Sequence, residues 1–259
     1  MQGRLSGSTA VVTGAARGIG AAIAHGLAEA GAAVTVVDRD GPGADQVAES
    51  VRDKGGRAVG VAADVTARAE VRMALDRAAA EFGRVDVVFN NAGLNVPQRF
   101  LEIDEQTWDR ILRVNSLGVL IGTQEAARRF LAQGGGGKIV NTASIAGRQG
   151  YPSFAAYSAS KAAVISLTQA AARALGEHGI TVNAFSPGVV RTPLWERLDK
   201  DLAAIGEGDS GFDAMSDAII LGKPAEPRDI VPTALFLAAS DSDYVTGQVM
   251  AIDGGMILV

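Results

Sequence analysis

The stretch Thr13-Gly14-Ala15-Ala16-Arg17-Gly18-Ile19-Gly20 directly follows an apolar run at 9–13 and leads into an Ala-rich segment. Its glycines have the spacing GxxxGxG. Glycines between a strand and a helix let the backbone approach a pyrophosphate closely, and the helix N-terminus offers free N–H groups to the anion. The stretch therefore predicts a dinucleotide-binding turn. The residues assigned to it are Gly14, Arg17, Gly18, Ile19 and Gly20.

Outward from this turn, short apolar runs alternate with longer Ala-rich segments. The runs predict strands at 9–13, 33–37, 58–62, 85–89, 138–142, 180–185 and 249–252. The longer segments predict helices at about 18–30, 44–54, 67–82, 104–132, 154–177 and 227–239. Near-continuous apolar runs suit strands that are covered on both faces. We therefore expect an α/β fold, a single Rossmann-type doubly wound parallel sheet of about seven strands flanked by helices, with its ligand crevice at the carboxyl ends of the strands.

Composition narrows the class of protein. A chain of 259 residues, 47% of them hydrophobic, suits one α/β domain spanning 1–259. A formal net charge of −5 without long Lys/Arg runs argues against nucleic acid as a partner. The absence of cysteine excludes disulfides and thiolate chemistry, and His25 and His178 lie too far apart in sequence to indicate a metal site. No apolar stretch approaches the about 18 residues of a membrane span, and no signal core is visible, so we expect a cytoplasmic protein.

The segment 190–226 is the longest irregular stretch of the chain. It carries Pro193, Trp195, Phe212 and Met215 among polar residues and glycines. This mixture is typical of a mobile lid over a substrate site, and a plain surface excursion is the alternative interpretation.

Asp38 stands at the end of the second predicted strand, eighteen residues beyond Gly20. A carboxylate at this place accepts both ribose hydroxyls of NAD and repels a 2′-phosphate. The alternative is a solvated turn residue. Arg17 and Arg39 lie close enough in sequence to pair with a 2′-phosphate, so the pattern favours NAD without excluding NADP.

Tyr157 and Lys161 are four residues apart in a predicted helix, and Ser144 lies thirteen residues before the tyrosine. Side chains at i and i+4 share a face of a helix. A lysine cation beside a phenol lowers a pKa that is about 10 in an unperturbed tyrosine, which suits a general acid/base for carbonyl and alcohol interconversion. A tyrosine four residues before a lysine often occurs by chance, and the alternative interpretation is that the two residues lie on a half-exposed helix face.

Taken together, these motifs resemble the short-chain dehydrogenase/reductase family over residues 5–255. The motifs that carry the resemblance occur in the family's order: TGxxxGIG at 13–20, Asp64-Val65, Asn90-Asn91-Ala92-Gly93, Asn115, Ser144, Tyr157, Lys161 and Pro187-Gly188. The resemblance implies an oxidoreductase that interconverts a secondary alcohol and a ketone with a nicotinamide cofactor. Ser144 and Tyr157 would bind the reacting oxygen, and Lys161 would bind the nicotinamide ribose and lower the pKa of Tyr157.

The resemblance also implies roles for the remaining motif residues. Asp64 and Val65 would hold the adenine, although Asp64 could instead cap a helix. Asn91 would support the adenosine end and the central sheet, and Asn115 would anchor a water linking Lys161 to solvent or merely satisfy backbone groups. The other residues expected to contact the cofactor are Ala92, Gly93, Pro187, Gly188, the backbone near Val190, and Thr192.

The substrate is expected to be a small hydroxyketone, diol or polyol, because residues 192–199, 220–224 and 243–256 look most like acetoin (2,3-butanediol) and bacterial polyol dehydrogenases. Those groups commonly carry a polar residue after the catalytic serine, where this chain has Ile145. An apolar neighbour cannot compensate the desolvation of a second hydroxyl. Gln149 or Ser153 could supply that contact, and Trp195 is also expected at the substrate.

Two other functions stay open. Reduction of a 3-oxoacyl thioester would need basic residues at the pocket mouth, for which Arg128, Arg129 and Arg148 are candidates. A nucleotide-sensing protein without turnover is the second alternative. The small residues of the helices at 104–132 and 154–177 allow close packing between copies, and we expect a homotetramer, as is common in the family.

Overall fold

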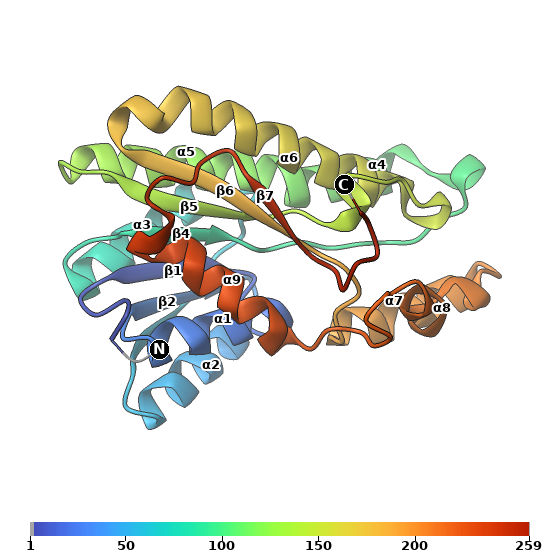
Figure 1. Ribbon diagram of the computed structural model, residues 1–259, viewed down its shortest axis with the longest axis horizontal. Coiled ribbons are helices and arrows are strands. Elements are labelled where there is room, and N and C mark those ends of the chain that lie inside the picture. The colour runs from blue at the N-terminus through green and yellow to red at the C-terminus, as the bar shows by residue number, and fades with distance from the viewer. Residues whose placement is uncertain (1–2, 259) are drawn as a thin grey trace.

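The computed structural model describes residues 3–258 as helices packed on both faces of a parallel sheet (Figure 1). The sheet has seven strands in the order β3-β2-β1-β4-β5-β6-β7. The predicted doubly wound α/β fold is therefore confirmed. The strands are β1 (Thr9–Thr13), β2 (Ala33–Asp38), β3 (Arg57–Ala62), β4 (Val87–Asn90), β5 (Gly137–Thr142), β6 (Ile180–Pro187) and β7 (Val249–Ile252).

Two hydrophobic cores lie on opposite faces of this sheet. Helices α1 (Gly18–Glu29), α2 (Gly41–Asp53) and α9 (Pro227–Ala238) bury their apolar residues against one face. Helices α3 (Arg68–Phe82), α5 (Gly118–Ala132) and α6 (Ala155–Leu175) cover the other (Figure 1). Because β1 and β4 are neighbours, the chain leaves the sheet in opposite directions on either side of them, which opens a crevice at the carboxyl ends of these strands.

The structure corrects three of the expected elements. The segment 190–226 is not irregular, because it contains α7 (Pro193–Ala204) and α8 (Phe212–Asp217). The predicted helix at 104–132 is divided into α4 (Glu105–Leu112) and α5 by a π-helical segment at Arg113–Leu117. Helix α2 begins at Gly41 rather than residue 44, since the Asp40 side chain accepts a hydrogen bond from Gly43 N and caps it.

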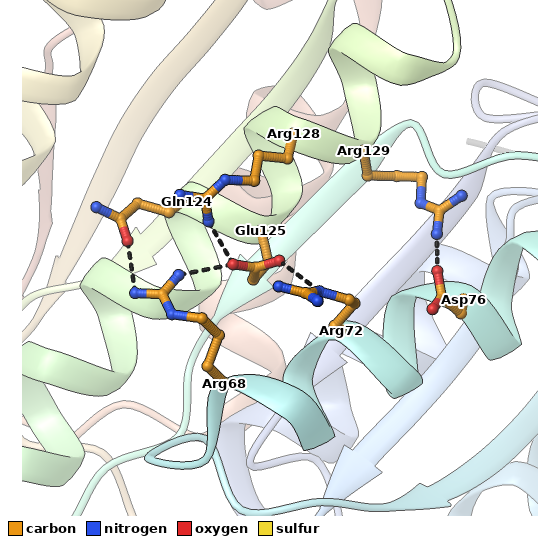
Figure 2. A network of polar contacts seen from close by, with 7 residues as sticks. All are labelled: Arg68, Arg72, Asp76, Gln124, Glu125, Arg128 and Arg129. Atoms are coloured by element: carbon orange, nitrogen blue, oxygen red, sulfur yellow. Dashed lines mark hydrogen bonds and ion pairs between the residues drawn. The ribbon is translucent and has the colours of Figure 1, made fainter.

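Helices α3 and α5 are joined by a charged cluster centred on Glu125 (Figure 2). Its carboxylate is buried and accepts hydrogen bonds from Arg68 (2.6 Å) and Arg72 (3.2 Å) and also pairs with Arg128. Burial alone would raise the pKa of Glu125, but the guanidinium groups outweigh it and the pKa is lowered. Nearby, Arg129 of α5 pairs with Asp76 of α3.

No helix within residues 3–258 combines the length and the apolar character that crossing a bilayer requires.

Candidate active site

The crevice at the carboxyl ends of the strands has two connected parts. The main cleft, about 520 Å³, is lined by the turn after β1, the ends of β2 and β4, and the first turns of α6. The side pocket, about 110 Å³, lies between the end of β5 and the segment after β6. The residues that line both parts are Ile19, Thr142, Tyr157, Thr192 and Leu194.

Nearly all the residues assigned to the cofactor converge on this crevice. Those that line the main cleft are Gly14, Arg17, Gly18, Ile19, Gly20, Asp38, Asp64, Val65, Asn91, Ala92, Gly93, Tyr157, Lys161 and Thr192. Pro187, Gly188 and Val190 line the side pocket instead, next to Thr192.

The turn after β1 is so tight that two of its positions admit only glycine. A Cβ on Gly20 would lie 2.3 Å from the carbonyl oxygen of Gly14, and a Cβ on Gly14, where φ is +63°, would lie 2.6 Å from Ala92 Cα. Helix α1 follows at once, with Arg17 as its N-cap and no side chain bonded to its first N–H groups. The free donors and the close backbone approach fit a dinucleotide pyrophosphate.

Asn91 holds this turn against the end of β4. Its Nδ2 donates to the carbonyl oxygens of Thr13 (3.0 Å) and Gly14 (3.1 Å). In return, the Thr13 hydroxyl accepts from the backbone N–H groups of Asn91 (3.0 Å) and Ala92 (3.2 Å). Asn91 therefore braces the turn and lines the main cleft.

Asp38 ends β2 and bonds to the same turn. Its carboxylate accepts hydrogen bonds from the backbone N–H of Ala16 (3.1 Å) and of Asp40 (3.0 Å). Arg17 is paired with Asp40 at 2.6 Å, whereas Arg39 is exposed at the cleft and has no ion pair with any residue of the described chain. The neighbourhood of Asp38 thus contains one paired and one unpaired guanidinium.

Asp64 lies exposed beside the half-buried Val65 at the far end of the main cleft. Its carboxylate accepts from Thr66 N at 2.8 Å, and its own backbone N–H donates to Glu70. Helix α3 begins at Arg68 with Ala67 as N-cap, so the alternative that Asp64 caps this helix is wrong.

Ser144, Tyr157 and Lys161 meet where the two parts of the crevice join. Ser144 follows β5, while Tyr157 and Lys161 lie one turn apart near the start of α6. The Ser144 Oγ accepts from Ala146 N at 3.2 Å, so its single proton is available to donate to Tyr157 or to a bound oxygen. Lys161 is buried, and its Nζ donates to the carbonyl oxygen of Thr142 at 2.6 Å.

The expected lowering of the Tyr157 pKa by Lys161 is wrong for the protein by itself. Burial raises the pKa of Tyr157, and a hydrogen bond with Ser144 offsets this only in part. The Lys161 ammonium is directed to Thr142 O and lies 5.7 Å from the centroid of the tyrosine ring. Burial also lowers the pKa of Lys161 from 10.5 to about 8.

Asn115 occupies the π-helical segment, a feature that often marks functional sites. Its fully buried carboxamide accepts from Leu94 N and donates to Leu94 O and Ser160 Oγ, each at 2.9 Å. Both amide protons are therefore used. The side chain holds the loop after Gly93 against α6, so a water that it anchored could bind only to its remaining lone pair or to the backbone.

The walls of the side pocket are mainly apolar. Of the residues expected at the substrate, Ser144, Ile145, Tyr157 and Trp195 line it. Trp195 packs edge-to-face between Phe154 and Phe212, at centroid distances of 6.3 and 5.6 Å.

Gln149 and Ser153 do not line this pocket. Gln149 is exposed in a surface hollow that adjoins the side pocket at Ala146 and Tyr151, and Ser153 is buried where its carbonyl accepts from Gln98 N. The structure therefore does not bring these two side chains to Ser144 as expected, because the chain leaves the pocket lining after Ala146 and returns to it at Tyr151.

Two polar residues of the pocket, Asn95 and Tyr151, were not predicted. Asn95 is 3% exposed, and its Oδ1 has no hydrogen-bond partner within residues 3–258. Leaving a buried acceptor unpaired costs about 1–3 kcal/mol. The only signal in the sequence is that Asn95 follows the Asn90–Gly93 motif by two residues.

The lid segment (residues 190–226) is closed on itself at its base. Arg191 N donates to Ala225 O (2.8 Å), and Ala225 N donates to Val189 O (3.0 Å). Beyond this clamp, Leu194, Trp195, Leu198 and Met215 of the lid segment line the pocket. Figure 1 shows α7 and α8 standing apart from the layers of the sheet.

The three arginines considered for an acyl carrier lie elsewhere. Arg128 and Arg129 are engaged with Glu125 and Asp76 between α5 and α3 (Figure 2). Arg148 donates to Val249 O at 2.7 Å and lines the same surface hollow as Gln149. None of them lines the main cleft or the side pocket.

The fold and this site define a dinucleotide-binding α/β protein with a Ser-Tyr-Lys group at the cleft. A family model described as short chain dehydrogenase matches residues 8–203. A diacetyl reductase, (S)-acetoin forming, of Staphylococcus epidermidis is 40% identical over 96% of this chain and 98% of its own length. An L-2,3-butanediol dehydrogenase of Corynebacterium glutamicum is 44% identical over 96% of this chain and 98% of its own length.

Solved structures agree with this assignment. A short-chain type dehydrogenase/reductase from Mycobacterium marinum superposes with a TM-score of 0.90 at 38% identity, covering 98% of this chain and 97% of the other. A structure titled as a putative NAD(P)-dependent gluconate 5-dehydrogenase from Beutenbergia cavernae, with bound NADP at low occupancy, has a TM-score of 0.86 at 40% identity, covering 97% of each chain. The chain therefore belongs to the short-chain dehydrogenase/reductase family, and its predicted likeness to acetoin and butanediol dehydrogenases is confirmed.

Proposed function

We propose that this oxidoreductase interconverts a small hydroxyketone, diol or polyol with its ketone, using NAD(H). The observation that carries the proposal is that Ser144 and Tyr157 line a small pocket which opens directly into the main cleft. Relatives named for diacetyl reduction and 2,3-butanediol oxidation support the substrate class.

The residues of the main cleft fit a nicotinamide dinucleotide. The backbone at Gly14, Gly18 and Gly20 would hold the pyrophosphate, and the Asp38 carboxylate would hold the adenosine ribose. Asp64 and Val65 would contact the adenine, while Thr192, whose hydroxyl forms no capping bond, would bind the carboxamide. When bound, the cofactor supplies or accepts the hydride.

Tyr157 acts as the general acid or base. Because its pKa is raised, the phenol keeps its proton at neutral pH and donates it to the oxygen of a ketone during reduction. Oxidation of an alcohol needs the phenolate, which is favoured at higher pH.

Ser144 stabilises the charge that develops on the reacting oxygen. Its Oγ is oriented by Ala146 N, so its proton can point to the substrate oxygen. A preorganised donor of this kind contributes about 2.7–4 kcal/mol to the transition state. Lys161, with a pKa of about 8, still carries its charge at pH 7 and would bind the nicotinamide ribose hydroxyls.

The experiment that tests this function is a panel of acetoin, diacetyl, butanediols, hexitols and an acetoacetyl thioester, each assayed with NAD(H) and NADP(H) by cofactor absorbance. We expect turnover of the C4 ketones or diols with NAD(H). Turnover of the thioester alone would support a 3-oxoacyl reductase, and no turnover of any substrate would support a nucleotide-sensing protein.

Cofactor choice is tested by Asp38→Ala. Loss of the carboxylate removes the acceptor for the ribose hydroxyls and the repulsion of a 2′-phosphate, and leaves the unpaired Arg39 nearby. We expect the ratio of kcat/KM for NADH over NADPH to fall by about tenfold or more, the equivalent of one lost hydrogen bond to a charged group. An unchanged ratio would remove Asp38 from the proposal.

A further inference from the structure

Asn95 is a polar residue of the side pocket whose buried side chain the proposed reaction leaves without a role. Ile145, beside Ser144, offers no hydrogen bond, and Gln149 and Ser153 lie outside the pocket. Asn95 lines the same pocket as Ser144 and Tyr157, and its buried Oδ1 lacks a partner within the described part of the chain. Among the described residues that line the pocket, Asn95 is thus the buried one with an unsatisfied hydrogen-bonding atom.

The backbone around Asn95 is held from both sides. The preceding residue, Leu94, is clamped through its N–H and its carbonyl by Asn115, at 2.9 Å each. The carbonyl of Asn95 itself accepts from Arg197 of α7 at 3.1 Å. The carboxamide thus extends from a loop fixed to the core on one side and to the lid segment on the other, which is the rigidity that a recognition group needs.

A carboxamide carries an acceptor and two donors, so it matches either a hydroxyl or a carbonyl. In a diketone the oxygen next to the reacting carbonyl can only accept, whereas in a hydroxyketone or diol it can also donate. Asn95 can serve all three without rearrangement of the pocket.

We infer that Asn95 recognises the second, unreacting oxygen of the substrate and makes the site selective for compounds with two adjacent oxygens. This inference rests on the proposed function and adds to it the residue that determines which class of substrate is preferred.

The test compares Asn95→Leu with the wild type, because leucine is close to asparagine in size and has no polar atom. The assay follows NADH oxidation with acetoin, which has a second oxygen, and with 2-butanone, which lacks it. We expect kcat/KM for acetoin to fall about 10- to 100-fold in the variant, while kcat/KM for 2-butanone changes little. NADH binding, followed by fluorescence, and Tm should stay near their wild-type values.

Asn95→Asp separates recognition from simple packing. An ionised carboxylate accepts from the hydroxyl of acetoin but cannot donate to the second carbonyl of diacetyl. Because burial favours the protonated acid, the two substrates are compared up to about pH 9, where the ionised form gains. We expect the ratio of kcat/KM for acetoin over diacetyl to rise about tenfold or more. A residue that merely filled space would leave this ratio unchanged.

Two further variants complete the design. Gln149→Leu, in the exposed hollow outside the pocket, is the control and should leave all ratios unchanged. Tyr151→Phe tests the other unassigned polar residue of the pocket. If Tyr151→Phe abolished the preference for acetoin over 2-butanone and Asn95→Leu did not, the inference would be overturned.

The failure of the inference and the failure of the proposed function give different results. A wild-type enzyme that reduces these ketones without preferring the second oxygen, or an Asn95→Leu variant that loses activity equally on acetoin and 2-butanone, overturns the inference alone. A wild-type enzyme that turns over none of these ketones and none of the butanediols or hexitols overturns both.

Discussion

The turn after β1 and the lid segment line the same crevice, but they are held by different kinds of contact. The turn is fixed by backbone hydrogen bonds to Thr13 and Asn91 and by glycine positions where a Cβ would overlap the backbone. The lid segment is clamped at its base by Ala225 and bonded through Leu221 N to Gly254 O, and its pocket side packs through side chains such as Trp195 with Phe154.

This difference separates two tasks. A dinucleotide has a constant shape, so a backbone cradle that admits one geometry suits it. The substrate pocket is shaped by replaceable side chains on a segment outside the sheet, so its specificity can change without disturbing the fold. Changes at the turn should therefore affect stability and cofactor binding. Changes to lid-segment side chains that line only the side pocket, such as Trp195, should affect the substrate.

The largest effect on catalysis is expected at Tyr157, which lines both the main cleft and the side pocket. Tyr157→Phe removes the proton donor but keeps the ring, so kcat should fall by about 10²- to 10⁴-fold. NADH binding, measured by fluorescence, should stay intact because both regions keep their structure. A variant that retained wild-type turnover would refute the role of Tyr157.

The next largest effect is expected on the pH dependence of stability. The free energy of unfolding of the cofactor-free wild type is compared with that of Lys161→Met, which removes the buried charge. The pKa of Lys161 is lowered from 10.5 to about 8, so between these values the unfolded chain holds a proton that the folded chain has released. The free energy of unfolding of the wild type should therefore rise relative to the variant from pH 8 to 10.5, by at most roughly 3 kcal/mol. Below pH 8 the difference should be flat.

Urea unfolding at several pH values measures this difference. A gap between the two proteins that does not depend on pH would show that Lys161 titrates normally in the folded state.

Gly20→Ala tests the rigid region directly. The added Cβ would lie 2.3 Å from Gly14 O and 2.6 Å from Asn91 Nδ2, so the turn must shift. We expect a loss of about 1–3 kcal/mol in stability together with weaker NADH binding. Gly135→Ala is the matched control, since its Cβ would meet nothing within 4 Å. Equal unfolding curves for the two variants would contradict the statement that the turn after β1 admits only glycine at position 20.

The smallest effect is expected from Trp195→Ala in the lid segment. It removes two edge-to-face contacts, each worth about 0.5–1.5 kcal/mol. KM for the ketone should rise several-fold, while the affinity for NADH stays the same. Trp195→Phe should recover part of the loss. If NADH binding weakened as much as ketone binding, the separation of the two regions would be refuted.

The sheet and the main cleft were predictable because their signals are local. The strands were recognisable as apolar runs, and the residues from Gly14 to Gly20 adjoin one another in sequence. The helices of the lid segment were missed, since turn-forming residues such as Gly206 and Gly211 lie between them and obscure their short periodic patterns. The homotetramer stays a prediction.

The sequence by itself determined the α/β fold and the family, and it predicted the dinucleotide turn and the acid/base group, because each depends on residue types at short, fixed spacings. Only the tertiary structure decided which polar residue faces the side pocket. The sequence favoured Gln149, but Asn95 is buried in the lining of the pocket that Ser144 also lines, whereas Gln149 lies exposed in the adjoining hollow. The same holds for the pKa of Tyr157, because burial and the direction of the Lys161 ammonium are properties of the packed chain rather than of the spacing of two residues.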